Sequence, residues 1–156
     1  AIPYPIFIVF KKTDNVSFSV AQKRYNLSDN QTATVENCWV TDWIAKGSMK
    51  AIYNEFFDSI RYSNLPKLHM KVCYQYWIDA FRALEIAGIT GIFELNIEDK
   101  EKNKRLELLF NYRDVQEQIV EYKAKLKKQS AFNEKVNLNV QIKELEQELT
   151  KLAKKL

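Results

Sequence analysis

Residues 104–126 read KRLELLFNYRDVQEQIVEYKAKL, and residues 138–156 read LNVQIKELEQELTKLAKKL. In both stretches apolar residues recur at alternating steps of four and three positions, as in Leu138, Ile142 and Leu145. This spacing is typical of a coiled-coil seam, because 3.5 residues per repeat keep one stripe facing a partner helix. The last third of the chain is therefore predicted to form helices that pack through a narrow apolar stripe.

The segment between the two stretches predicts a turn. Gln129 and Ser130 interrupt a run of good helix formers, Ser130 can cap a second helix, and Glu134 suits the first turn of that helix. We therefore expect an antiparallel helical hairpin over residues 104–156, with Phe132 plugging its open end. No glycine or proline forces a turn here, so one continuous helix that dimerises in parallel is the alternative.

The first part of the chain predicts a small antiparallel sheet. Ile6–Phe10 is an unbroken apolar run of strand length, which predicts a central strand buried on both faces. In residues 16–20 apolar and polar side chains alternate, as expected for a half-buried strand. Residues 34–44 predict a third strand. One face of this strand is expected to carry three apolar side chains: Val35, Trp39 and Trp43.

Helical spacing of the apolar residues follows the predicted strands. The segment from residue 49 to 60 predicts a helix with Ser48 as its N-cap. A second helix is expected over residues 68–87, with Gly88 closing it in the C′ position. Residues 92–97 predict either a short edge strand or an extended connection.

These patterns together predict an α+β protein, in which helices cover a small antiparallel sheet and a C-terminal antiparallel helical hairpin, a coiled coil, projects. The core domain is expected over residues 1–97, a charged linker over residues 98–103 and the hairpin over residues 104–156. The chain opens at Ala1 rather than at methionine, so we expect an upstream segment to precede it.

The composition indicates a globular protein with its own core, since 46% of the 156 residues are hydrophobic and 13% are aromatic. The two cysteines, Cys38 and Cys73, suit neither a disulfide framework nor a zinc site. No signal peptide or membrane-length apolar run is visible, so a cytoplasmic protein without a membrane partner is expected.

Positive charge is concentrated in the last part of the chain. The net charge is +4, but residues 100–156 carry fourteen Lys or Arg against nine Asp or Glu. Lysines near the phosphates of a nucleic acid release counterions and gain affinity that does not depend on sequence. Four lysines at the expected hairpin tip are therefore candidates for nucleic-acid binding: Lys123, Lys125, Lys127 and Lys128. Alternatively, these lysines are the solvated flank of a helix and compensate its C-terminal dipole.

Few residues could carry catalysis. No glycine-rich phosphate loop, nucleophile elbow or paired-cysteine motif occurs, and His69 is the only histidine, so we predict neither a metal site nor a cofactor. The weak candidates are Glu36 and Asp42, which a period of two would place on one face of a strand, together with Lys23. Such a cluster could hold magnesium in a nuclease. Exposed charges on the solvent side of a sheet explain the same residues.

Three short segments carry a resemblance to a family: IPYPI at residues 2–6, TDW at residues 41–43 and FNEKVNLN at residues 132–139. They resemble an uncharacterised bacterial and archaeal domain-of-unknown-function family that is encoded beside helicase and DNA methyltransferase genes. The resemblance implies an accessory role in restriction-modification or phage defence, with a helicase or methyltransferase as protein partner. It also implies an additional N-terminal region, and it assigns no catalytic residue. One departure is Gln22, where a tyrosine is expected before the Lys-Arg pair.

The leading hypothesis is a non-catalytic interaction subunit that docks a protein partner through the apolar stripe of the hairpin. The residues expected to bind the partner lie on one stripe of the second helix: Leu138, Ile142, Leu145, Leu149 and Leu152. A leucine-rich stripe without a buried Asn or Lys also admits a second copy of itself, so a homodimer is a further expectation. The alternatives are a nucleic-acid-binding module that uses the basic tip, and a metal-dependent nuclease.

Overall fold

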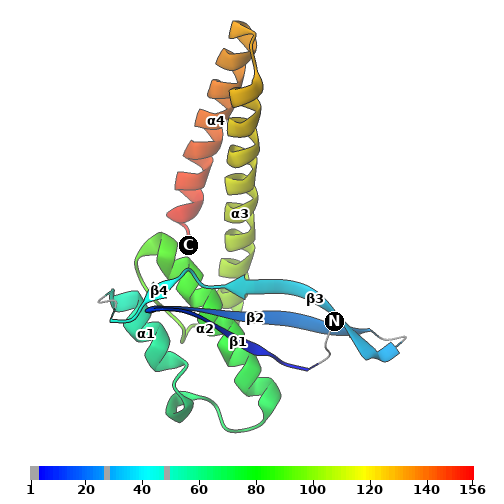
Figure 1. The fold of residues 1–156 in the computed structure, drawn as a ribbon, viewed down its shortest axis with the longest axis vertical. Helices are drawn as coiled ribbons and strands as arrows, with labels where there is room; N and C mark the ends of the chain where they lie inside the picture. The colour runs from blue at the N-terminus through cyan, green and yellow to red at the C-terminus, as the bar shows by residue number, and fades with distance from the viewer. Residues whose placement is uncertain (1–3, 27–28, 48–49) are drawn as a thin grey trace. The chain divides into compact units, whose positions relative to one another are not determined.

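The structure, a computed structural model, describes residues 4–26, 29–47 and 50–156 (Figure 1). The chain divides into two compact units, Ala1–Leu95 and Asn96–Leu156, which we call the core unit and the hairpin unit. The core unit holds an antiparallel sheet and two α-helices, and the hairpin unit holds two long helices. The predicted α+β class is therefore confirmed.

The sheet of the core unit has the strand order β1–β2–β3. The strands are β1 (Phe7–Lys12), β2 (Asn15–Asn26), β3 (Asp29–Val40) and the short β4 (Ile44–Ala45). Each pairing is antiparallel, and β2 pairs with all the others. β4 pairs with the start of β2, whereas β3 pairs with the rest of it, so together they form the ladder on one side of β2.

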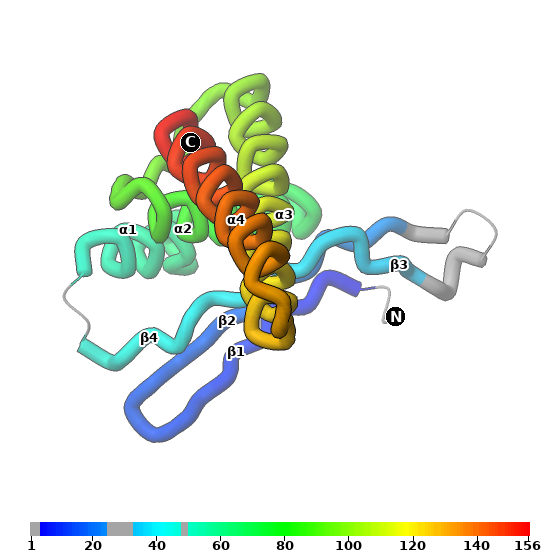
Figure 2. The backbone as a smooth tube through the Cα atoms, turned by 90° about the horizontal axis from the view of Figure 1, so that it is seen from above, coloured from blue at the N-terminus to red at the C-terminus, as the bar shows by residue number. Residues whose placement is uncertain are grey.

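Two α-helices, α1 (Ala51–Ser59) and α2 (Met70–Thr90), cover one face of this sheet (Figures 1 and 2). A 3-10 turn at Tyr62–Asn64 lies between them. The covered face is packed by six aromatic rings, with neighbouring ring centroids 4.8 to 6.3 Å apart: Phe7, Phe18, Phe56, Phe57, Trp77 and Phe81. Packing of these large rings against one another stabilises the core unit.

The ends of α2 follow helix-capping chemistry. Nδ1 of His69 accepts a hydrogen bond from the backbone N–H of Val72, which satisfies one of the free donors of the first turn. Gly91 follows the last turn with φ of 82°, the left-handed conformation that glycine adopts without strain. Gly91 therefore closes the helix, and the expectation for Gly88 is wrong. Ser48, the expected N-cap of α1, lies outside the described residues.

The expectation of a doubly buried strand at residues 6–10 is also wrong. Among the described strands β1 pairs only with β2, so it is an edge strand. The ring of Phe7 packs 4.8 Å from that of Trp77 on the covered face. The next three side chains are between 42 and 56% exposed: Ile8, Val9 and Phe10. An unbroken apolar run indicates double burial only where layers cover both faces of the sheet, and the core-unit helices cover one.

A β-bulge at Glu36 reverses the direction of the side chains along β3. Between two neighbouring residues of β2 the pairing partner moves from Val35 to Asn37, so Glu36 is the extra residue. Trp39 is 2% exposed on the covered face, whereas Val35 is 45% exposed on the other side of the bulge. Trp43 lies beyond the end of β3 and is exposed. The expectation that these three residues share a face is therefore wrong, because a bulge shifts the period of two.

The hydroxyl of Tyr74 on α2 joins β1 to β2 at the point where the two strands separate. It accepts a hydrogen bond from the backbone N–H of Ala21 at 3.1 Å. The carbonyl oxygens of Ala21 and Ile6 lie 2.8 and 3.1 Å from the same hydroxyl and accept its proton. The last residue pair of the β1–β2 ladder at this end is Phe7 with Val20, so Ile6 and Ala21 do not pair with each other. The Tyr74 hydroxyl takes the place of the backbone partner that each of them lacks.

The hairpin unit consists of α3 (Asp99–Lys128) and α4 (Phe132–Ala153), which run antiparallel and side by side (Figures 1 and 2). α3 begins at Asp99, so residues 99–103 form its first turns and are not a linker. Residues 92–97 contain no strand and form the extended connection that was one of the two expectations. The chain reverses over residues 129–131, which agrees with a hairpin and not with one continuous helix.

Candidate functional site: the helical hairpin

The apolar stripes predicted from the sequence face each other inside the hairpin unit. Val115 and Ile119 of the predicted α3 stripe are buried, and so is Ile142 of the α4 stripe. Leu109 on α3 is also buried, whereas its neighbour Leu108, which the predicted spacing places on the stripe, is half-buried. The other stripe leucines of α4 are half-buried: Leu138, Leu145, Leu149 and Leu152. Of the residues predicted to bind a partner, Ile142 is thus buried within the hairpin, whereas the four leucines are partly accessible to another molecule.

Partial burial of these leucines follows from the geometry of two helices. A helix in a bundle buries an apolar stripe at least 100° wide, whereas a single neighbouring helix covers only the middle of that stripe. The edges of the α3–α4 stripe therefore remain in contact with water, although they are apolar. A further helix lying along the hairpin would bury them.

The turn of the hairpin is closed by Gln129 and not by Ser130. Oε1 of Gln129 accepts hydrogen bonds from the backbone N–H groups of Ser130 and Ala131, and Nε2 donates to the carboxylate of Glu134. The side chain thus satisfies two backbone N–H groups of the turn and contacts a carboxylate in the first turn of α4. Phe132 is 78% exposed, so the expectation that it plugs the open end is wrong.

The four predicted lysines lie near this turn, but they are not equivalent. Lys123 pairs with Glu146 of α4 at 2.7 Å, and the ammonium of Lys125 lies over the ring of Tyr122 at 5.0 Å. The first contact joins α3 to α4, and the second holds Lys125 against the surface of α3. Lys127 and Lys128 are exposed, and neither makes an ion pair or a hydrogen bond within the described part of the chain.

The weak catalytic candidates are not arranged as a metal-binding cluster. The carboxylate of Glu36 pairs with Arg24 at 3.0 Å, and the ammonium of Lys23 donates to the carbonyl of Tyr4 at 2.9 Å. Asp42 lies beyond the end of β3 and is exposed, so the period of two does not relate it to Glu36. Residues 4–26, 29–47 and 50–156 contain no group of three His, Cys, Asp or Glu that could hold a metal ion.

Thr41, beside Asp42, has a structural role. Its Oγ1 accepts a hydrogen bond from the backbone N–H of Phe18 at 3.0 Å, and its carbonyl accepts one from the hydroxyl of Ser17 at 2.8 Å. These bonds hold the connection between β3 and β4 against β2. The TDW segment therefore contains one residue that fixes the backbone and two exposed side chains, Asp42 and Trp43.

Sequence reasoning missed a polar cluster on the covered face of the sheet. The guanidinium of Arg82 lies 4.7 Å above the ring of Trp39, donates to Gln22 at 2.9 Å and pairs with Asp79 at 3.3 Å. Burial lowers the pKa of Arg82, and the charge of Asp79 opposes that shift. The i,i+3 acid–base pair inside an apolar helix was the signal that could have revealed the cluster. The contacts of Arg82 with Trp39 and Gln22 fasten α2 to the sheet.

None of the helices in the described part of the chain is long and apolar enough to span a membrane. The exposed large apolar side chains of the hairpin unit are Val120 on α3 and, at steps of four residues on α4, Phe132, Val136 and Val140. The surface of this unit is dominated by charged residues.

The family model described as Domain of unknown function (DUF4391) matches residues 1–149, nearly the whole chain. No curated protein and no solved structure gives a match to this chain.

Proposed function

Because this chain belongs to the DUF4391 family, whose description assigns no activity, we propose from its geometry that it is a non-catalytic interaction subunit that docks a protein partner through the helical hairpin. The observation that carries the proposal is the half-burial of the leucines on α4 in a unit of only two helices. Each partly exposed leucine keeps apolar area in water that a third helix would remove. The partner is therefore a protein that presents an amphipathic helix.

The class of partner is inferred from the family that the IPYPI, TDW and FNEKVNLN segments resemble. We propose a helicase or a DNA methyltransferase of a restriction-modification or phage-defence system. An accessory subunit of such an assembly needs a docking surface and no catalytic set of its own. The ion pair of Glu36 with Arg24 and the position of Asp42 supply no support for a nuclease.

The test compares two pairs of substitutions on the same helix, both four residues apart. Leu145→Lys with Leu149→Lys puts charge on the docking stripe, and Val136→Lys with Val140→Lys puts the same charge on exposed positions. The tagged full-length protein is captured from its native cells. The leucine variant should lose the helicase or methyltransferase, and the valine variant should keep it.

The leucine variant also needs a fold control, because its residues contact α3. Circular dichroism should show whether the helix content of the hairpin is kept, and Leu145→Ala with Leu149→Ala is the milder form of the same change. If the folded leucine variants retain the partner as well as the valine variant does, the stripe is not the docking surface.

A second candidate function is nucleic-acid binding at the hairpin tip. The observation that favours it is the exposed ring of Phe132 near the same turn as Lys127 and Lys128, which have no ionic partner within the described residues. An exposed ring can stack on a base while lysines bind the backbone. Lys127→Gln with Lys128→Gln should weaken binding to single-stranded DNA and reduce its salt dependence by about two phosphate contacts. Binding that is unchanged in this variant would exclude the tip.

A further inference from the structure

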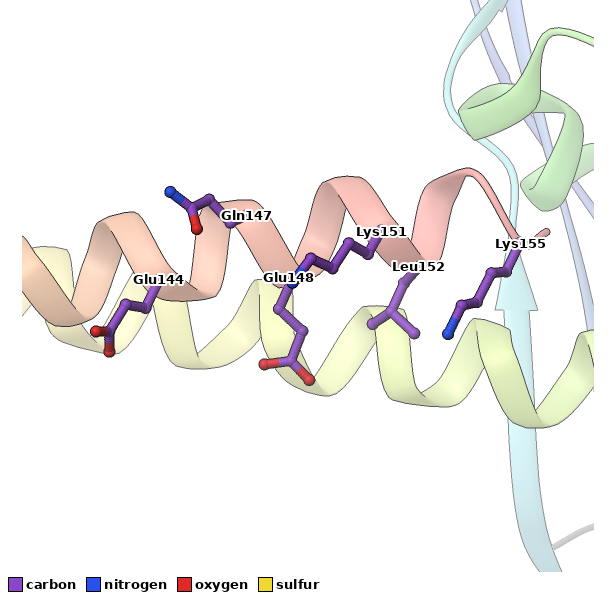
Figure 3. A pocket seen from close by; sticks show the side chains of 6 residues that line it. All are labelled: Glu144, Gln147, Glu148, Lys151, Leu152 and Lys155. Atoms are coloured by element: carbon purple, nitrogen blue, oxygen red, sulfur yellow. The ribbon is translucent and has the colours of Figure 1, made fainter.

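The outer face of α4 carries charges that are separated along the helix. Six residues line an open hollow on this surface (Figure 3): Glu144, Gln147, Glu148, Lys151, Leu152 and Lys155. Figure 3 shows the side chains of Glu144, Glu148 and Lys155 extending to the same side of the helix. The acidic residues come first along the chain and the basic residues follow them. We call this set of six residues the outer face.

Within the helix the charges of the outer face meet both like and opposite charges. Glu144 and Glu148 are four residues apart and repel each other, whereas Glu148 and Lys151 are three residues apart and attract, and Lys155 follows the end of α4. Lys151 lies in the last turn of α4, where the helix dipole favours positive charge. None of these four charges forms an ion pair within the described part of the chain. All four charges are therefore available to a second molecule.

The same order is complementary to itself when the helix is turned around. In a symmetric antiparallel pair, a residue before the two-fold axis faces the residue at the same distance beyond the axis in the other copy. An axis between Leu149 and Thr150 pairs all six residues of the outer face with one another. Glu144 faces Lys155 of the second copy, Glu148 faces Lys151, and Gln147 faces Leu152.

We propose that the outer face of α4 binds the outer face of a second copy of this chain, with the two α4 helices antiparallel. The interface then contains four ion pairs, two of each kind, around a contact between Leu152 and the stem of Gln147. A parallel arrangement would place glutamate on glutamate and lysine on lysine, so the charges also select the direction. Two hairpins joined in this way form a four-helix assembly.

The size of the outer face predicts a weak association. Residues 144–155 extend for about 17 Å along the helix, which is short for a protein interface. Solvent-exposed ion pairs contribute little each and are screened by salt. We therefore expect a dimer that forms at roughly 10–100 μM protein in low salt and dissociates at high salt.

This inference does not rest on the proposed partner. It concerns the outer face of α4, whereas the proposed docking uses the apolar stripe, and only Leu152 belongs to both. Self-association of the purified chain can therefore be present or absent whatever the outcome of the capture experiment.

The test is sedimentation of the purified full-length chain, with charge-reversed variants. Glu144→Lys with Glu148→Lys makes the outer face wholly basic, and Lys151→Glu with Lys155→Glu makes it wholly acidic. Each variant alone should self-associate at least about tenfold more weakly than the wild type. An equimolar mixture of the two should form a heterodimer, because every contact is then between opposite charges.

Two further variants separate this effect from misfolding and from net charge. The chain with all four reversals has the charge order inverted but still complementary, so it should self-associate like the wild type. Lys135→Glu with Lys143→Glu changes the net charge as much as the acidic variant does, but outside the outer face, and should leave the dimer intact. A wild-type chain that stays monomeric at about 100 μM in low salt would overturn the proposal. So would a dimer that none of the reversals weakens, or folded variants whose mixture does not associate.

Discussion

Replacing Ile142 with alanine should destabilise the hairpin unit much more than replacing Val140, two residues away on the same helix. Ile142 is 6% exposed in the seam, and Val140 is 52% exposed on the outside of α4. Ile142→Ala removes three carbon atoms from an almost fully buried position. The lost transfer free energy is about 2.5 kcal/mol, and the cavity adds to it. Alanine returns a few tenths of a kcal/mol in helix propensity, so the expected loss is about 2–4 kcal/mol.

Val140→Ala is the matched control. It removes two carbon atoms from a position that is already half in water, which costs about 0.8 kcal/mol. The higher helix propensity of alanine offsets most of that cost, so the free energy of unfolding should change by less than about 0.5 kcal/mol. The comparison thus isolates burial in the seam from the effect of shortening a side chain on α4.

Two spectroscopic signals report on the two units during urea unfolding. Trp39, Trp43 and Trp77 all lie in the core unit, so tryptophan fluorescence follows that unit. Circular dichroism at 222 nm is dominated by the hairpin, because α3 and α4 are the longest helices. Ile142→Ala should lower the midpoint from circular dichroism and leave the midpoint from fluorescence nearly unchanged. Equal effects of Ile142→Ala and Val140→Ala would refute the seam.

Three further changes test contacts of the core unit. Tyr74→Phe should lower the free energy of unfolding by about 2 kcal/mol in chemical denaturation, because backbone groups next to the β1–β2 ladder lose their partner. Tyr76→Phe is the control and should cost almost nothing, since the Tyr76 hydroxyl bonds to no described residue. Equal costs would contradict the role of the Tyr74 hydroxyl. Thr41→Val keeps the shape but leaves a β2 amide without its acceptor, so urea titration should show a loss of about 1–2 kcal/mol, and an unchanged midpoint would exclude that role. Arg82→Lys should lower the thermal midpoint by a few degrees, because lysine cannot keep both the stacking contact and the side-chain hydrogen bond; a variant as stable as the wild type would show that neither contact contributes.

The hairpin could be predicted from sequence because its information is local and periodic. The spacing of Val115, Ile119 and Ile142 identifies the buried stripe, and these residues are buried in the structure. The turn was placed correctly at residues 129–131, but its chemistry was not, since Gln129 rather than Ser130 satisfies the free backbone groups. Which polar side chain folds back on a turn depends on its rotamer, and residue type alone does not determine that.

The sheet was harder to predict because burial there depends on distant segments. The run Ile8–Phe10 has the composition of a central strand, and only the position of the helices shows that it is an edge. The bulge at Glu36 has no signature in the sequence, yet it decides that Val35 and Trp39 face opposite sides. Asp42 lies beyond the end of β3, so the period of two does not relate it to Glu36, and the basis for a carboxylate cluster is removed.

Candidate function was the least predictable property. The leucine stripe was expected to bind a partner, but the structure shows that the two stripes first cover each other, with Ile142 buried between them. The outer face of α4 was not expected, because its charges look like an ordinary solvated surface unless the helix is compared with its own reversed copy.

Docking through the hairpin is tested by comparing the proteins that co-purify with the full chain and with a chain ending at Leu95, the boundary of the core unit. Tryptophan fluorescence of the shortened protein should show the same unfolding midpoint as in the full chain, since all three tryptophans stay in their unit. The full chain should retain a helicase or methyltransferase partner, and the shortened chain, although folded, should retain none. A folded core unit that still binds the same partner would contradict docking through the hairpin.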